Sequence, residues 1–396
     1  MKPLQLSANI KSIIGVSREA PRVIQLTDFH RSKPKDRHHA ALIDSNEDFI
    51  VAINSGWTLL VCKDQVSSLY EADHSQCSIF LDASANYLKA GDVISLNLEK
   101  RRFRTLFRIE SKHNSFLVTE RCNHLCLMCS QPPKDHDDSW LLDEIEECLP
   151  LLPTSVESIG FTGGEPLTDS VRFIALLEKA RHHLPKTRLH VLSNGRYFAE
   201  NSVTAAWSNL NDKNLCVGIP IYSCVDHVHD HIVQSKGALD ETIMGILRLK
   251  DRAQKVEIRL VLHALTVPTV VETCRWIARS LPFVDHVALM GLENTGYAIA
   301  NTGTLWIDPV DYSDDLSRAV EELASARVPV SIYNLPKCVL PKKCWPYAMM
   351  SISDWKNSFL PQCSECTERS KCSGFFSTGR PRFSRGVTPF LTATGT

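Results

Sequence analysis

Three cysteines stand close together in the middle of the chain, at positions 122, 126 and 129 of the run LVTERCNHLCLMCSQPP. Thiolates at spacings of four and three residues can surround one soft metal centre, and no ordinary fold requires that spacing. Four ligands close a structural zinc or iron-sulfur site, so three cysteines leave one metal atom open. The spacing therefore predicts a reactive metal centre. A zinc knuckle that lacks one ligand, or core thiols that lie together by coincidence, are the alternatives.

A glycine-rich turn is the second candidate for chemistry. Gly163, Gly164, Glu165 and Pro166 lie in the run FTGGEPL. Paired glycines let a backbone approach a ligand closely, and a carboxylate beside them can accept hydrogen bonds from an ammonium group. We interpret the turn as a ligand site, with a plain tight turn as the alternative.

A third group of candidates lies near the C-terminal end. Cys363, Cys366 and Cys372 are again closely spaced, and Cys338 or Cys344 would complete a set of four thiols for one closed centre. Four thiolates also suit zinc, so a structural zinc site is the alternative to an iron-sulfur cluster. The sequence does not decide which of Cys338 and Cys344 is the fourth ligand.

The elements that must position these residues alternate between strands and amphipathic helices from about residue 114, which is typical of a parallel sheet. At roughly 200 residues this stretch is shorter than a complete eight-unit barrel. We therefore predict an α/β fold with a partial (β/α)6 TIM-type barrel, and a doubly wound sheet is the alternative. The expected strands are 115–120, 158–163, 189–194, 215–222, 256–264 and 286–291, with helices near 140–152, 170–183, 199–209, 239–253 and 269–280.

Two further parts flank this core of residues 113–327. Residues 1–112 carry short β-type runs such as FIVAIN, TLLVCK, CSIFLD and DVISLNL, which predict a small β-rich N-terminal domain. Residues 328–396 form a cysteine-rich C-terminal extension, which a helix at 312–326 and a strand at 328–334 connect to the core.

Composition limits the classes of partner. The 396 residues are 43% hydrophobic and 22% charged, and the formal net charge of −1 gives no electrostatic case for nucleic acid or an anionic membrane. No apolar run approaches the length of a membrane span, and MKPLQLSANIKSIIG lacks the features of a secretion signal, so we expect a cytoplasmic location. Because cytosolic thiols stay reduced, the clustered cysteines among the 14 are better explained by metal binding than by disulfides.

The motifs CxxxCxxC, in CNHLCLMC, and GGEP together resemble the radical S-adenosylmethionine (SAM) superfamily. The resemblance implies a 4Fe-4S cluster on Cys122, Cys126 and Cys129, with SAM chelating the fourth iron. Reductive cleavage of SAM would then give a 5′-deoxyadenosyl radical that takes a hydrogen atom from the substrate. By the same resemblance Met128 packs beside the adenine, and the GGEP turn binds the amino group of SAM.

Weaker SAM contacts follow from the resemblance at the next strand ends. Ser193 and Asn194 would contact the ribose and carboxylate, although a plain turn is the alternative there. Pro220 stands where relatives often carry a ribose-contacting serine, and Ser223 is the substitute. Arg259 is a candidate partner for the SAM carboxylate, because a guanidinium pairs with a carboxylate bidentately.

Several runs look more specific than the superfamily, namely CNHLCLMCSQPPK, LSNGR, GIPIYS and ISDWKN. This combination resembles the radical SAM maturases of the His-Xaa-Ser peptide-modification system, the HxsC-like branch. It implies a ribosomally made peptide substrate, a partner radical SAM protein of the same system and an electron donor such as flavodoxin or ferredoxin. The terminal cysteines are similar to the auxiliary 4Fe-4S extensions of peptide-modifying relatives, although Phe376 stands where a larger version of the extension has a further cysteine.

Three other functions remain open from the sequence. A radical SAM enzyme could act on a nucleotide or a small metabolite instead of a peptide, although the near-neutral charge speaks mildly against this. A zinc-dependent binding module would use the terminal cysteines alone and would leave GGEP unexplained. An iron-sulfur electron-transfer protein would carry the clusters without cleaving SAM.

Overall fold

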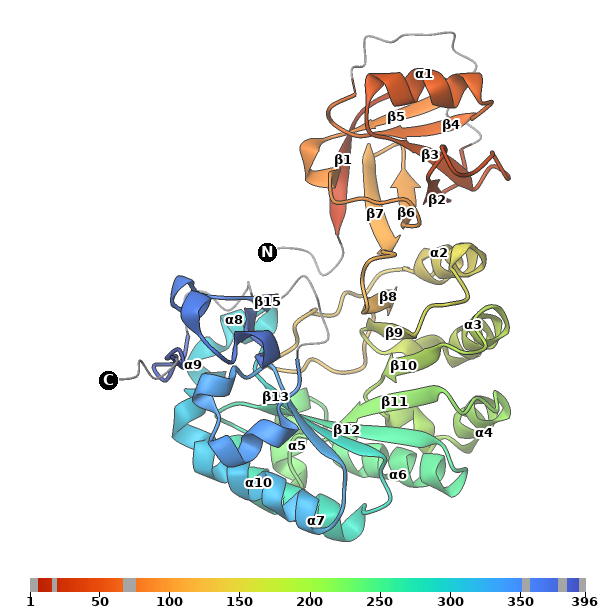
Figure 1. Ribbon diagram of the computed structural model, residues 1–396. Coiled ribbons are helices and arrows are strands. Elements are labelled where there is room, and N and C mark those ends of the chain that lie inside the picture. The colour runs from red at the N-terminus through yellow and green to blue at the C-terminus, as the bar shows by residue number, and fades with distance from the viewer. Residues whose placement is uncertain (1–5, 16–19, 67–75, 351–356, 377–382, 392–396) are drawn as a thin grey trace. The chain divides into compact units, whose positions relative to one another are not determined.

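The computed structural model describes residues 6–15, 20–66, 76–350, 357–376 and 383–391 (Figure 1). Most of the run ISDWKN, residues 352–356, lies outside these ranges. The chain forms two compact units. One comprises Met1–Phe116, Ser139–Ile159 and Glu178–Thr187, and the other comprises Leu117–Asp138, Gly160–Leu177 and Arg188–Thr396.

The first unit contains a closed seven-stranded barrel with the order β1-β5-β4-β3-β2-β6-β7. Apolar side chains such as Leu26, Leu81, Ile94 and Phe103 fill one core cluster. The β-rich N-terminal domain expected from the sequence is thus confirmed. The strands are β1 (Ser7–Ile14), β2 (Val23–Thr27), β3 (His39–Ile43), β4 (Leu59–Cys62), β5 (Cys77–Leu81), β6 (Val93–Asn97) and β7 (Arg102–Phe107).

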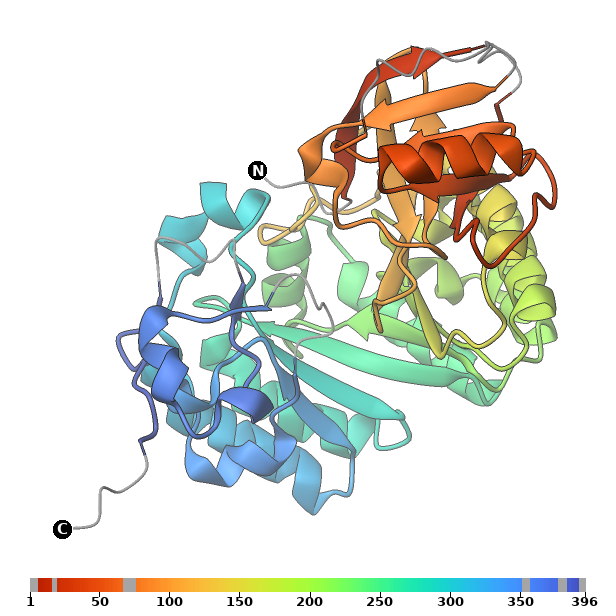
Figure 2. The same cartoon turned by 45° about the horizontal axis from the view of Figure 1, so that its top comes forward.

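The run FIVAIN, expected as a strand, belongs to helix α1 (Asn46–Asn54), so that prediction is wrong. The Ser45 side chain caps this helix by accepting a hydrogen bond from the Asp48 backbone N–H at 3.1 Å. Glu47 and Asp48 also place negative charge in the first turn, where the helix dipole favours it. Phe49 and Ala52, three residues apart, bury one face of the helix. Figure 2 shows α1 lying across the strands of the barrel.

Helix α2 (Trp140–Cys148) also belongs to the first unit and docks through a buried carboxylate. Glu144 accepts a hydrogen bond from Ser95 Oγ at 2.6 Å and forms an ion pair with Arg104. The Arg104 guanidinium also lies 4.6 Å from the centre of the Trp140 ring. These contacts hold α2 against strands β6 and β7.

The second motif of the fold is a seven-stranded sheet whose strand order, β14-β13-β12-β11-β10-β9-β8, follows the chain. Each neighbouring pair from β10 to β14 is parallel. A doubly wound sheet would reverse its order at a switch point, so this sheet is the predicted partial TIM-type barrel. Its strands are β8 (Asn114–Thr119), β9 (Ser158–Gly163), β10 (Arg188–Leu192), β11 (Leu215–Pro220), β12 (Lys255–Leu262), β13 (His286–Gly291) and β14 (Val330–Tyr333).

Helices connect the strands and cover one face of the sheet, as α4, α6, α7 and α10 do in Figure 1. In β12 the alternate residues Val256, Ile258, Leu260 and Leu262 are buried, while the residues between them are partly exposed on the other face. The remaining elements are α3 (Ser170–His183), α4 (Asn201–Asn209), α5 (Asp226–Val233), α6 (Ala238–Asp251), α7 (Val270–Ser280), α8 (Tyr297–Ala300), α9 (Thr302–Leu305), α10 (Ser313–Ser325), β15 (Asn357–Ser358) and β16 (Phe375–Phe376).

The two compact units do not follow the three expected domains. Residues 139–159 and 178–187 fall with the N-terminal barrel, and the cysteine-rich segment after residue 328 belongs to the second unit. Within the described residues, every helix is too short or too polar to cross a membrane.

Replacing Glu144 by Gln should weaken the docking of α2, because the change removes the negative charge that faces the Arg104 guanidinium. We expect a loss of roughly 3 kcal/mol in the free energy of unfolding of the first unit, measured by urea denaturation followed by circular dichroism. Glu146→Gln on the same helix breaks the solvent-exposed pair with Lys179 and should cost less than about 1 kcal/mol. Equal losses from the two substitutions would contradict this account.

Candidate active site

The loop that carries Cys122, Cys126 and Cys129 follows β8 and is bonded to the end of helix α5. The backbone N–H of Leu125 donates to Val233 O at 3.2 Å, and that of Leu127 donates to Ile232 O at 2.9 Å. Carbonyls in the last turn of a helix have no partners within the helix. The cysteine loop supplies two of the missing donors, and α5 thereby fixes the central part of the loop.

The segment after β13 holds the other end of the cysteine loop. The backbone N–H of Tyr297 donates to Cys129 O at 2.8 Å, and Asn301 Nδ2 donates to Leu127 O at 2.8 Å. Gly296 has a φ of +55°, and a Cβ atom at this position would lie 2.3 Å from Cys129 O. Only glycine allows such a close approach of the two backbones.

The GGEP turn packs against the start of the same loop. The backbone N–H of Gly164 donates to Thr119 O and that of Glu165 donates to Arg121 O, both at 2.8 Å. A Cβ atom at Gly163 would lie 2.2 Å from Thr119 O, and one at Gly164 would lie 2.0 Å from Arg121 O. The paired glycines, expected from the sequence to admit a ligand, are here required for contact between two segments of the chain itself.

The Glu165 side chain is completely buried and faces the turn that follows β10. Its carboxylate accepts hydrogen bonds from Asn194 N at 2.6 Å, from Ser193 Oγ at 2.9 Å and from Leu167 N at 3.0 Å. Burial raises the pKa of Glu165 to about 7, although these hydrogen bonds partly oppose the shift. The carboxylate therefore joins the ends of β9 and β10, and its oxygens already have donors within the chain.

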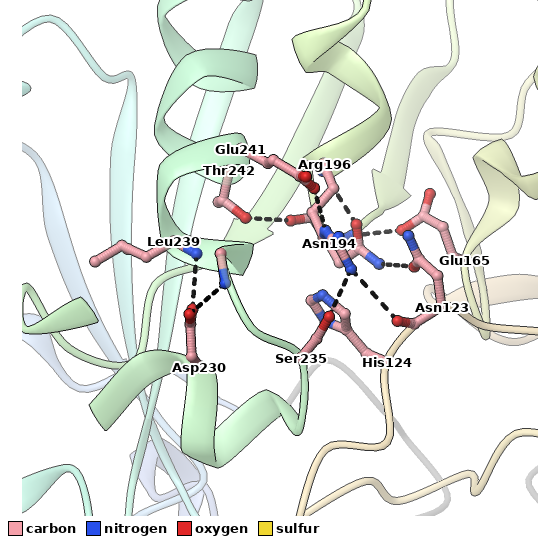
Figure 3. Close-up of polar contacts among 12 residues, drawn as sticks. Asn123, His124, Glu165, Asn194, Arg196, Asp230, Ser235, Leu239, Glu241 and Thr242 are labelled. Carbon is pink, nitrogen blue, oxygen red and sulfur yellow. Dashed lines mark hydrogen bonds and ion pairs between the residues drawn. The ribbon is translucent and has the colours of Figure 1, made fainter. Parts of the chain in front are cut away.

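Asn194 and Arg196 connect the turn after β10 to the cysteine loop (Figure 3). Asn194 Nδ2 donates to Asn123 Oδ1 at 2.5 Å. The Arg196 guanidinium contacts Asn123 O at 3.5 Å, donates to Ser235 Oγ at 2.8 Å and pairs with Glu241 at 2.5 Å. The run LSNGR was expected only as a family signature, and the roles of Asn123 and Arg196 could not be predicted, because their contacts join segments that are about 70 residues apart.

The three thiols of the loop fit a cluster with one open iron. Burial raises the pKa of Cys122 to about 12, and Cys126 and Cys129 are shifted in the same direction. Cys122 and Cys129 each raise the pKa of Cys126 further, as expected for thiols that lie near one another. Such thiols lose their protons when a metal binds them.

Within the described residues, no three histidine, cysteine or acidic side chains are arranged to hold a single metal ion. The ligands of a four-iron cluster bind different iron atoms, so their sulfurs need not converge on one point. The observation that fits the cluster is that three thiols lie on one loop, whose backbone is held in place by hydrogen bonds.

Comparison with known families identifies the part of the chain that carries this site. Residues 116–277 match the radical SAM superfamily, and this range includes the cysteine loop, the GGEP turn and the turn after β10. These residues form a radical SAM domain. No curated protein has a sequence that matches the chain significantly.

Several solved structures also resemble part of the chain. SuiB from Streptococcus suis, bound to S-adenosylmethionine, is 13% identical with a TM-score of 0.46 over 58% of this chain and 52% of its own. Native anSMEcpe with bound AdoMet is 17% identical with a TM-score of 0.44 over 55% and 62%. Coproporphyrinogen III oxidase (HemN) from Escherichia coli, described as a radical SAM enzyme, is 14% identical with a TM-score of 0.44 over 54% and 52%. The chain thus aligns with about half to two thirds of the length of these proteins.

Met128 and Ser223 of the radical SAM domain both point into packed surroundings. Met128 is buried in an apolar cluster that includes Tyr222 and Ile232. The Ser223 hydroxyl is completely buried, lies 3.0 Å from Thr269 Oγ1 and accepts a hydrogen bond from Val225 N at 3.1 Å. This placement gives Ser223 a role in its own turn and does not support the expected contact with the ribose.

Arg259 of the radical SAM domain is already paired with a carboxylate of the chain. Its Nη1 donates to Glu257 Oε1 at 2.7 Å, and its Nη2 lies 3.1 Å from Met290 Sδ. Glu257 also contacts His286 Nδ1 at 2.9 Å and His190 Nε2 at 3.5 Å. Burial alone would raise the pKa of Glu257, but these contacts outweigh it and hold the pKa well below its usual range. The sequence did not predict this pair. Glu257 binds the Arg259 guanidinium, which was expected to pair with the SAM carboxylate.

Beyond the radical SAM domain, one cavity of about 340 Å³, a volume that includes open solvent at its mouth, brings together four of the five C-terminal cysteines, Cys338, Cys363, Cys366 and Cys372. Cys344 is not among the residues that line it. The Cys344 thiol is buried 3.4 Å from Ser317 Oγ. The geometry therefore favours Cys338 over Cys344 as the fourth thiol of this group.

Backbone N–H groups point at the sulfurs of this cavity. Lys337 N and Gly374 N donate to Cys372 Sγ at 3.4 and 3.5 Å, and Phe390 N donates to Cys366 Sγ at 3.4 Å. Hydrogen bonds to the sulfurs stabilise thiolates and tune the potential of a bound cluster. The cavity thus brings together four thiols and three backbone N–H groups that donate to two of their sulfurs.

Glu165→Gln should destabilise the radical SAM domain in the absence of SAM, because an amide N–H₂ would replace one carboxylate oxygen that now accepts from Asn194 or Ser193. We expect a loss of about 1–3 kcal/mol in the free energy of unfolding. The pKa of Glu165 in the folded protein, about 7, lies above its usual value of 4.5. The contribution of Glu165 to stability is therefore fully present below pH 4.5 and is lost as the pH rises through 7. The difference between the two proteins should therefore shrink over this range.

Denaturation of both proteins at several pH values measures this effect. Glu178→Gln, at an exposed position of α3, is the matched control and should leave stability unchanged. A difference between wild type and Glu165→Gln that grows with pH would contradict the assignment.

Proposed function

We propose that the chain is a radical SAM enzyme that cleaves SAM reductively at a 4Fe-4S cluster on Cys122, Cys126 and Cys129 and modifies a ribosomally made peptide. The observation that carries the proposal is the junction of the three-cysteine loop with the GGEP turn at one end of the partial barrel, through the hydrogen bonds of Gly164 and Glu165. When bound, the cluster supplies the electron that splits SAM into methionine and a 5′-deoxyadenosyl radical.

The residues of the chain would act by holding this site in one geometry. Backbone hydrogen bonds from α5 and from the segment after β13 fix the direction in which the three thiols point. Glu165 holds Ser193 and Asn194 beside the GGEP turn, and these are the groups we propose to contact SAM. Orientation of this kind accelerates a reaction because the reacting groups need not find one another in solution.

A peptide is the proposed substrate because the runs CNHLCLMCSQPPK, LSNGR and GIPIYS resemble the His-Xaa-Ser maturases. A partner radical SAM protein of the same system and a donor such as flavodoxin or ferredoxin would complete the reaction, in the cytoplasm. The structure gives LSNGR a physical role, because Asn194 and Arg196 both contact the cysteine loop.

We also propose a second, auxiliary 4Fe-4S cluster on Cys338, Cys363, Cys366 and Cys372. The shared cavity and the backbone donors around its sulfurs support this assignment. A cluster with four cysteine ligands has no open iron and would serve electron transfer or peptide binding rather than the cleavage of SAM.

Cys126→Ala should abolish the cleavage of SAM, because a loop with two thiols cannot hold the cluster. The measurement is the yield of 5′-deoxyadenosine after anaerobic reconstitution with iron and sulfide and the addition of SAM and dithionite. Cys224→Ala, which removes a partly exposed thiol outside both groups, should keep at least about half of the wild-type yield. If the cluster-loaded wild type forms no 5′-deoxyadenosine, the proposed function is wrong.

Cys338→Ala should remove the auxiliary cluster, whereas Cys344→Ala should leave it in place. We expect iron and acid-labile sulfide to fall by about half in Cys338→Ala, because one of two four-iron clusters is lost. Unchanged iron in Cys338→Ala, or stoichiometric zinc in the protein as purified, would overturn the assignment.

A further inference from the structure

The ring of His124 is buried inside the cysteine loop, between the first and second of its three thiols. The residue is only 3% exposed, and histidine is less often fully buried than apolar residues are. Polar atoms that leave water need hydrogen-bond partners, so a buried imidazole has to place two ring nitrogens. The contacts of these two nitrogens indicate what the ring does in the loop.

His124 contacts two of the three sulfurs of the loop. Its backbone N–H donates to Cys122 Sγ at 3.4 Å, and its ring Nδ1 atom lies 4.0 Å from Cys126 Sγ. The second distance is at the long end for a hydrogen bond to sulfur, which is a larger atom than oxygen. One residue is thus placed to supply donors to two of the expected cluster ligands.

The direction of the ring contact depends on the state of the thiol. In the metal-free chain either partner can donate, because a thiol and an imidazole each can carry a proton. A thiol that binds a metal loses its proton and can only accept. The hydrogen of a bond between His124 and a metal-bound Cys126 must therefore come from Nδ1, which leaves Nε2 as the bare nitrogen.

The surroundings of Nε2 fit this tautomer. The Nε2 atom of His124 is buried and has no hydrogen-bond partner among the described residues. Buried N–H groups without an acceptor are rarer in proteins than buried acceptors without a donor. The partnerless position therefore suits the bare nitrogen, and the proton belongs on the side of the ring that faces Cys126.

We propose that His124 is a positioning residue for the SAM-cleaving cluster, whose Nδ1–H group donates to Cys126 Sγ and makes the cluster easier to reduce. Hydrogen bonds to the sulfurs are among the factors that set the potential of an iron-sulfur cluster. The reduced cluster carries one more negative charge than the oxidised cluster, so a donor to its sulfur stabilises the reduced state more. The inference rests on the proposed function, because it takes the three cysteines to hold this cluster.

The step that the bond assists is the transfer of one electron from the external donor protein to the oxidised cluster. The donor protein is oxidised by one electron and the cluster is reduced by one. His124 gives up neither an electron nor a proton, because its hydrogen stays on Nδ1 throughout. Its effect is therefore on the potential of the cluster and not on the chemistry of SAM.

Three variants of the full-length protein test the inference. His124→Phe keeps a planar ring but removes the donor. His124→Asn keeps an N–H group, because the asparagine amide nitrogen and the histidine Nδ1 are both bonded to Cγ. His227→Phe, at an exposed position of α5, is the matched control for the loss of an imidazole.

The measurement is a potentiometric titration of each reconstituted protein, followed by electron paramagnetic resonance in the absence of SAM. The cluster on the cysteine loop is recognised in a parallel sample as the one whose signal changes when SAM is added. At the potential that reduces half of this cluster in the wild type, we expect its ratio of reduced to oxidised forms to be about tenfold lower in His124→Phe. For a one-electron couple this is a shift of about 60 mV toward more negative potential.

His124→Asn should stay within about threefold of the wild-type ratio, because it retains a donor, and His227→Phe should match the wild type. An unchanged potential in His124→Phe would overturn the inference. A full shift in His124→Asn would also overturn it, because the ring would then act by its shape alone.

His124→Leu replaces His124→Phe if the larger ring prevents loading with iron. Loss of iron from both variants, at an unchanged melting temperature of the metal-free protein, would overturn the inference as well, because His124 would then serve assembly of the cluster and not its reduction. If SAM alters no signal of the iron-loaded wild type, the proposed function itself is contradicted. The two failures can therefore be told apart.

Discussion

The site depends on the hydrogen bonds that fix the backbone of the cysteine loop. Residues 122–129 contain no helix or strand, so the loop cannot hold three thiols in place by its own structure. Carbonyls at the end of α5, the glycine turn after β9, the side chains of Asn194 and Arg196 and the segment after β13 supply the missing partners. Each comes from a different strand-to-helix connection of the partial barrel. The parallel sheet serves function mainly by bringing these connections to one edge.

Buried and partly buried carboxylates serve this arrangement as structural acceptors. Glu165 joins two strand ends, and Asp230 accepts from the backbone N–H groups of Gly237 and Leu239 at the start of α6. Glu257 pairs with Arg259 and contacts two histidines, His286 and His190, on neighbouring strands of the sheet. Acidic side chains that are fully bonded in this way are costly to replace, because their donors would stay buried without a partner. The charged residue of a recognisable motif such as GGEP can thus be a positioning group rather than a direct ligand.

Most of the fold of the second unit could be predicted from the sequence, because the strand and helix periodicities are local. The six expected strands and the helices between them are present with boundaries within a few residues. The run FIVAIN was misread because the capping by Ser45 outweighs the β propensity of its branched side chains. Close cysteine spacing marked both thiol groups, but the roles of Arg196 and Glu257 depend on contacts between distant segments. Only the folded chain shows that Cys338, and not Cys344, lies with the last three cysteines.

Pro336 and Phe375 line both the cysteine cavity and a second hollow, which Leu262, Trp306 and Phe383 also line. Two cavities that share lining residues can be energetically coupled, because a group bound in one cavity can change the packing of the residues that line the other. Such coupling is reciprocal. If a metal centre on the cysteines raises the affinity for a ligand in the second hollow by some factor, the ligand raises the affinity for that centre by the same factor. If the proposed centre forms on the four cysteines, the residues that line both hollows give it a route to affect what the second hollow binds.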